Sequence, residues 1–377
     1  MLESFDFGAN DGATLWLVLV GLLLLVGWIA GELAARLRLP RLTGYMLAGG
    51  VFGLLDRVYP AIDLQQPARL LGEMGLGVLL FDLGRRVDFS WLKRDPTLAL
   101  TAAAEMAASF IACFGLLYLL NIPVPWAAVG AAIAMATSPG VVIAIVRDAR
   151  AQGQVTERLL WLTAANTTVA AILSMLLVGW FQAEKMTTWW HALVLYPAYL
   201  IAGSLLLAAM VATVVSLLAR WVRKDAEHLV MSFAAILLTL AVARGLGLSV
   251  PLSLLALGLI THHRHRRADL SGEEFGNTAQ PLIVLFFVFA GTSLASADWL
   301  AYGWAAVGLA AARTLAKWLA AGLAARASGL AFRHSFRLGL ALMPMSGLSL
   351  MLAVDIGRFD PAFNAPLAGI LLPAIAL

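Results

Sequence analysis

Long apolar runs alternate with short polar or basic stretches along the whole chain. A helix needs about 20 mainly apolar residues to cross the hydrocarbon core of a bilayer, and fewer where it is broken or buried among other helices. The runs predict thirteen membrane-spanning segments: 15–34, 41–54, 68–84, 97–119, 126–147, 157–181, 189–219, 229–247, 250–262, 280–296, 300–325, 334–356 and 363–377. The predicted fold is an all-α polytopic membrane protein. Because the last run is still apolar at Leu377, we expect a C-terminal continuation.

The composition supports this prediction and excludes other classes of protein. Hydrophobic residues make up 61% of the chain, charged residues only 13%, and the mean hydropathy is +0.87. Soluble domains carry about 25% charged residues. The single cysteine, Cys113, gives no Cys-based metal cluster or disulfide framework. With no nucleotide-binding, nucleophilic or zinc motif in the sequence, we expect no enzyme activity, no metal, no cofactor and no nucleic-acid partner.

Basic residues gather in every second connecting stretch, which indicates the orientation in the membrane. Cytoplasmic loops carry an excess of Lys and Arg. With the N-terminus outside, most of the 26 Lys and Arg residues fall in cytoplasmic loops, around 36–41, 85–94, 147–158, 220–224, 264–267 and 326–337. The pattern predicts a multi-pass protein of the cell inner (plasma) membrane with an outside N-terminus.

Thirteen segments divide into six, one linker and six, which gives two halves of opposite orientation. The predicted repeats are 15–181 and 229–377, joined by a linker helix at 189–219 within a single transporter domain. Equivalent segments of the two halves are interrupted midway. Segment five contains Thr137, Ser138, Pro139 and Gly140, and segment twelve contains Pro344, Met345, Ser346 and Gly347. Pro and Gly break helices, so we expect crossed discontinuous helices at segments five and twelve and a binding site at the membrane midplane.

Four stretches stand out in order along the chain: 39–49 (LPRLTGYMLAG), 75–84 (GLGVLLFDLG), 286–294 (FFVFAGTSL) and 313–317 (RTLAK). In this order they resemble the monovalent cation:proton antiporters, especially the branch of the glutathione-gated potassium efflux systems. The resemblance implies a homodimer in the lipid bilayer. It also implies a core domain of segments four to six and eleven to thirteen with elevator-like movement, and exchange of a monovalent cation, K⁺ or Na⁺, for protons.

The chain departs from this family at the residues that bind the ion. The family carries Asp-Asp or Asn-Asp at the centre of segment six, whereas this chain has Asn166 followed by Thr167. The potassium-efflux branch has Arg-Gly-Glu in segment twelve, where this chain has Ser346, Gly347 and Leu348. We therefore expect a retained fold with a degenerate ion-binding motif.

Three charged residues remain at membrane depth: Glu105, Arg313 and Lys317. A charge at that depth is costly and is expected to be paired. One interpretation is a structural salt bridge between Glu105 and Arg313. A second is that Glu105 replaces the missing aspartate as the group that binds the proton. A third is that Arg313 and Lys317 favour a small anion as substrate.

Neutral oxygens gather at the two breaks, on Asn166, Thr167, Thr137, Ser138 and Ser346. Such groups replace part of a cation's hydration shell, but they also form ordinary hydrogen bonds between helices. The predicted function is a secondary transporter of a monovalent cation, coupled to protons without the usual aspartate. The alternatives are an uncoupled or transport-inactive member with a regulatory or sensing role, or a transporter of a small anion.

Overall fold

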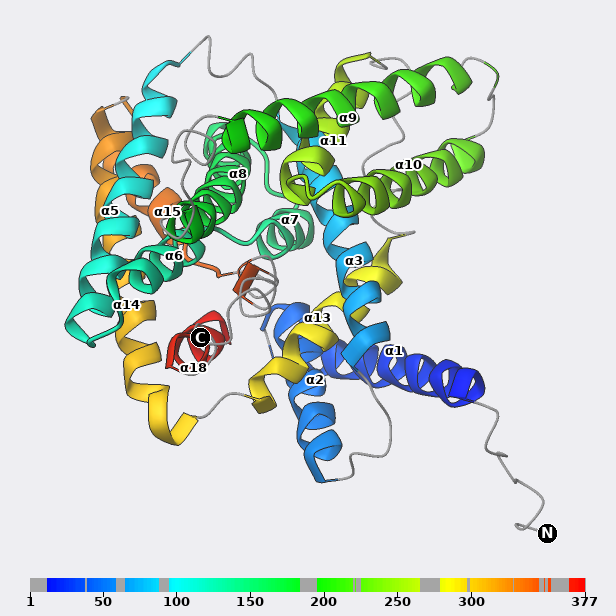
Figure 1. Ribbon diagram of the computed structural model, residues 1–377, viewed down its shortest axis with the longest axis horizontal. Coiled ribbons are helices and arrows are strands. Elements are labelled where there is room, and N and C mark those ends of the chain that lie inside the picture. The colour runs from blue at the N-terminus through cyan, green and yellow to red at the C-terminus, as the bar shows by residue number, and fades with distance from the viewer. Residues whose placement is uncertain are drawn as a thin grey trace. The chain divides into compact units, whose positions relative to one another are not determined.

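The computed structural model describes residues 12–37, 39–58, 65–87, 95–183, 195–219, 221, 225–264, 279–296, 299–327, 329–345, 349, 352–353 and 366–376. Every regular element in these ranges is a helix (Figure 1). In chain order the helices are α1 (Gly12–Arg36), α2 (Arg41–Val58), α3 (Gln65–Arg86), α5 (Thr97–Leu119), α6 (Val124–Ala134), α7 (Pro139–Asp148), α8 (Gln154–Ala183), α9 (Tyr196–Leu218), α10 (Asp225–Gly245), α11 (Val250–Arg264), α13 (Gln280–Ser296), α14 (Trp299–Ala327), α15 (Phe332–Ala341) and α18 (Pro366–Ala376).

These helices fall on the predicted segments. Helix α5 has the bounds predicted for segment four, and the predicted segment 126–147 is divided into α6 and α7. Within the described ranges, six helical stretches are long and apolar enough to cross a membrane: Leu17–Arg36, Thr97–Leu119, Val124–Arg147, Gln154–Val178, Tyr196–Leu218 and Glu227–Gly245. The prediction of an all-α membrane protein is confirmed for this part of the chain.

The chain forms two compact units, one of Met1–Gly75 with Gln280–Ser296 and one of Leu76–Ala279 with Ala297–Leu377. In the first unit, α2 and α13 pack closely because each has a glycine where they meet. A Cβ atom built on Gly49 would lie 1.9 Å from the carbonyl oxygen of Val288, and one on Gly291 would lie 2.1 Å from that of Met46. Small residues of this kind let membrane helices approach closely. The division into inverted repeats and a linker remains a prediction.

In the second unit, α14 packs against α5, α15 and α18, and α6 packs against α5 and α8. Two interrupted helical segments lie between these neighbours. Helix α6 ends at Ala134 and α7 begins at Pro139, while α15 ends at Ala341 and is followed by non-helical residues up to Met345. The breaks contact each other directly, because the backbone N–H of Ser138 donates to the carbonyl oxygen of Pro344 over 2.9 Å.

Candidate ion-binding site

The break between α6 and α7 is built by its own residues. Pro139 lacks a backbone N–H and occupies the first position of α7, where a helix needs no donor. The side-chain oxygen of Ser138 accepts a hydrogen bond from the Val141 N–H over 3.2 Å and so caps α7. Gly140 follows Pro139 inside the first turn of α7. The structure therefore gives Ser138 a capping role.

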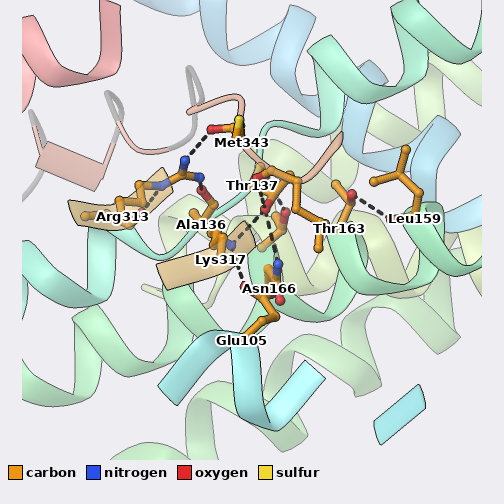
Figure 2. A network of polar contacts seen from close by, with 12 residues as sticks. Glu105, Ala136, Thr137, Leu159, Thr163, Asn166, Arg313, Lys317 and Met343 are labelled. Carbon is orange, nitrogen blue, oxygen red and sulfur yellow. Dashed lines mark hydrogen bonds and ion pairs between the residues drawn. The ribbon is translucent and has the colours of Figure 1, made fainter. Parts of the chain in front are cut away.

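The centre of the site is an ion pair between α5 and α14 (Figure 2). The Lys317 Nζ atom lies 2.8 Å from Glu105 Oε2, and both side chains are 0% exposed. Lys317 also donates to Thr137 Oγ1 over 3.1 Å, which ties the pair to the α6–α7 break. An ammonium and a carboxylate at such depth require each other, because an unpaired buried charge is strongly destabilising.

Arg313 corrects one interpretation of the sequence, since Lys317, not Arg313, is the partner of Glu105. The Arg313 guanidinium donates instead to backbone carbonyls at the breaks: Nε to Ala134 over 2.5 Å, Nη2 to Ala136 over 2.7 Å, and Nη1 to Met343. The last carbonyls of a helix have no partner within the helix and form the negative end of its dipole. A planar guanidinium with five donors can satisfy several of them at once.

Asn166 and Thr167 on α8, two of the predicted site residues, both contact Thr137. The Asn166 amide Nδ2 donates to Thr137 Oγ1 over 3.1 Å, and the Thr167 hydroxyl donates to the Thr137 carbonyl over 3.2 Å. Thr137 in turn donates from Oγ1 to the Leu342 carbonyl over 3.2 Å. The two breaks, α8 and the Glu105–Lys317 pair therefore form one continuous polar network (Figure 2).

Three buried oxygens around this network lack a hydrogen-bond partner in the described part of the chain: Glu105 Oε1, Ser109 Oγ and Asn166 Oδ1. Buried polar atoms in proteins are almost always satisfied. These oxygens therefore leave capacity for water or a cation next to the ion pair. The sequence analysis missed Ser109, although it lies four residues after Glu105 and on the same buried side of α5.

Not every predicted residue is described. Ser346 and Gly347 lie outside the described residues, whereas Pro344 accepts the Ser138 N–H in the second break. Ser349 was not predicted from the sequence; its hydroxyl donates to the Ile133 carbonyl over 3.1 Å. In the described ranges, no three His, Cys, Asp or Glu residues are grouped as they would be around a metal ion.

Residues 20–372 match the family described as "Sodium/hydrogen exchanger, transmembrane". This chain belongs to that family. The exchanger fold is also that of the sodium proton antiporter MjNhaP1 from Methanocaldococcus jannaschii, with a TM-score of 0.77, 19% identity, and coverage of 97% of this chain and 94% of that one. A second MjNhaP1 structure, from electron microscopy, matches with a TM-score of 0.73, 17% identity and coverage of 96% and 94%. No curated protein matches the chain.

These findings confirm the predicted superfamily and a multi-pass membrane protein with an exchanger fold. The potassium-efflux branch, the homodimer and the outside N-terminus stay predictions. At the identity of the MjNhaP1 structures, the likeness shows the fold alone, so the roles of residues in this exchanger depend on its own contacts.

Proposed function

We propose that this exchanger family member moves a monovalent cation across the membrane in exchange for a proton, and that Glu105 and Lys317 together replace the missing segment-six aspartate. The observation that carries the proposal is the fully buried Glu105–Lys317 pair at two contacting helix breaks. Broken helices in secondary transporters place backbone groups and half-helix ends at the substrate. The motif resemblance makes K⁺ as well as Na⁺ a candidate, and implies a homodimer.

The pair provides coupling without a change in net charge. In the absence of a cation, Glu105 is negative, Lys317 is positive, and their sum is zero. When Lys317 releases one proton, its ammonium charge is lost and Glu105 keeps its negative charge. A cation then binds beside Glu105, where the unpartnered oxygens of Glu105 and Asn166 lie. The sum is again zero, so one cation is exchanged for one proton.

The same contacts disfavour an anion as substrate. The Arg313 guanidinium already binds three backbone carbonyls, and the Lys317 ammonium is bound to Glu105 and Thr137. The positive charges of Arg313 and Lys317 are therefore both already bound to oxygens of the protein, which disfavours their binding an anion. In the described part of the chain, the buried atoms without a hydrogen-bond partner on Glu105, Ser109 and Asn166 are all oxygens, which suit a cation or water.

The test uses the full chain in proteoliposomes. A pH gradient is imposed, and its dissipation is recorded on addition of Na⁺, K⁺ or Li⁺, with and without a clamp on the membrane potential. We expect dissipation by at least one cation at a rate that the clamp leaves unchanged, because the exchange is electroneutral. If no cation dissipates the gradient, cation antiport is wrong for this chain.

Thr167→Asp, tested in the same assay, restores the carboxylate that the family carries. We expect the half-saturating cation concentration to fall about tenfold, because one more charge-assisted contact contributes about 1.5 kcal/mol or more. Thr167→Ser, which keeps the hydroxyl bound to the Thr137 carbonyl, is the control and should behave as wild type. Activity in Thr167→Asp with a silent wild type would instead favour the regulatory alternative, a transport-inactive member that has lost its coupling group.

A further inference from the structure

Helix α5 carries a row of polar side chains along its buried side. Thr97, Thr101, Glu105 and Ser109 follow each other at intervals of four residues, and burial follows the same row from Thr101 onward. Thr101 is 1% exposed, and Glu105 and Ser109 are 0% exposed. The row therefore places three hydroxyl side chains and one carboxylate on one side of the helix.

The row begins at a charged cluster where α5 begins. Asp95 accepts hydrogen bonds from the backbone N–H and the hydroxyl of Thr97, and its Oδ2 lies 2.6 Å from Arg158 Nη2. The Asp95 side chain is 17% exposed, in contrast to the fully buried Glu105. Thr101 donates from Oγ1 to the Thr97 carbonyl over 3.0 Å. Hydrogen bonds therefore join the partly exposed carboxylate of Asp95 to Thr97 and Thr97 to Thr101, one helical turn before Glu105.

The row ends on the far side of Glu105. Ser109 is followed by Cys113 and then by Leu117, both 0% exposed. Leu117 offers no hydrogen-bonding side-chain atom. In the described part of α5, the hydroxyl row thus runs from the end that carries Asp95 to Ser109, one turn past Glu105.

The spacing of the row suits single bridging waters. Four residues of an α-helix rise about 6 Å, which is close to the length of two successive O–H···O hydrogen bonds of about 2.8 Å each. A buried water needs two to four polar partners. Glu105 Oε1 and Ser109 Oγ are buried oxygens of this row that have no partner in the described ranges, and they supply such positions.

We propose that this row, from Asp95 through Thr97 and Thr101 to Glu105, is the path by which the exchanged proton passes between the Glu105–Lys317 pair and the side of the membrane at which Asp95 lies. The inference rests on the proposed exchange. At Thr101, the hydroxyl turns from the Thr97 carbonyl to a bridging water, one proton arrives at its oxygen from a second water, and its original proton leaves to the first. At Thr97, one proton arrives from a water and the original proton passes to the Asp95 carboxylate, which releases it to solvent, so both hydroxyls are unchanged. Ser109 lies one turn beyond Glu105, and its hydroxyl would bind the water that bridges to Glu105 Oε1. Asp95, Arg158, Glu105 and Lys317 are the charged groups along the path.

Thr101→Val tests the path because it replaces the buried hydroxyl by a methyl group of similar size. The measurement is proton release after rapid mixing of the detergent-solubilised full chain with Na⁺, K⁺ or Li⁺, followed by a pH-indicator dye. We expect the wild type to release one proton per bound cation. In Thr101→Val the same amplitude should appear at least tenfold more slowly. Thr101→Ser, which restores the hydroxyl, should recover the wild-type rate.

Thr261→Val is the matched control. Thr261 on α11 also donates its hydroxyl to the carbonyl four residues earlier, that of Leu257 over 2.8 Å, but lies outside the row. Thr261→Val should leave the amplitude and the rate of proton release unchanged.

Three outcomes would contradict these expectations. If Thr101→Val released protons at the wild-type rate and with full amplitude, the path would be wrong and the proposed exchange would remain intact. Loss of amplitude in Thr101→Val would assign Thr101 to the cation site and also overturn the path. Absence of proton release from the wild type would refute the exchange itself.

Discussion

Glu105→Gln should abolish cation-driven proton movement in proteoliposomes, with a loss of at least about 100-fold. The amide keeps the size of the side chain and can still accept a hydrogen bond from Lys317, but it has no negative charge to hold a cation. Two opposite unit charges about 4 Å apart attract each other by about 4 kcal/mol at an effective dielectric constant of about 20, and each 1.4 kcal/mol corresponds to about tenfold in affinity. The initial rate of pH-gradient dissipation measures the effect.

Two further variants separate lost coupling from lost stability. Glu105→Gln leaves the Lys317 charge buried without a counter-charge, so it should also lower the thermal unfolding midpoint. The double variant Glu105→Gln with Lys317→Met removes both charges and should recover most of the midpoint but none of the exchange. Glu227→Gln, on an exposed residue of α10, is the matched control and should transport as wild type. Exchange in Glu105→Gln at the wild-type rate would show that the pair is not the coupling device.

The helices were predictable because the bilayer imposes a length and an apolar composition on every spanning segment. Pro139 begins α7, and Pro344 lies in the non-helical residues after α15; proline cannot continue the backbone hydrogen-bond ladder. Spacing along the chain could not give the division of the helices into two compact units. The close approach of Gly49 to Val288 of α13, inside the first unit, is likewise visible only in the folded structure.

The partner of Glu105 in the ion pair could not be predicted from the sequence. Arg313 and Lys317 are four residues apart and share a face of α14, so both were available to Glu105. Arg313 binds backbone carbonyls at the breaks, and Lys317 therefore pairs with Glu105. The positions of these carbonyls cannot be read from the sequence. A signal was nevertheless present: broken helices leave carbonyls without partners, and arginine is the side chain with the most donors. The sequence grouped Thr137, Asn166 and Thr167 as candidate site residues but did not indicate that Thr137 hydrogen-bonds to the other two.

Arg313→Lys is expected to lower stability strongly although it keeps the positive charge. The three guanidinium nitrogens Nε, Nη1 and Nη2 bind one carbonyl each, on Ala134, Met343 and Ala136. A lysine ammonium is a single point of donation and cannot reach three acceptors arranged around a planar fork. If two of these bonds are lost, at about 1.5–3 kcal/mol for each bond to a charged group, the free energy of unfolding falls by about 3–6 kcal/mol.

The control for this prediction lies on the same helix. Arg326 is exposed near the end of α14, with its guanidinium carbon 5.4 Å from the centre of the Phe332 ring. Arg326→Lys keeps a cation over the ring and should change the thermal unfolding midpoint little. If Arg313→Lys were as stable as Arg326→Lys, the carbonyls at the two breaks would have to be satisfied without the guanidinium. A large difference would identify Arg313 as the residue that holds the two broken helices together, which leaves Glu105 and Lys317 as the charges available for exchange.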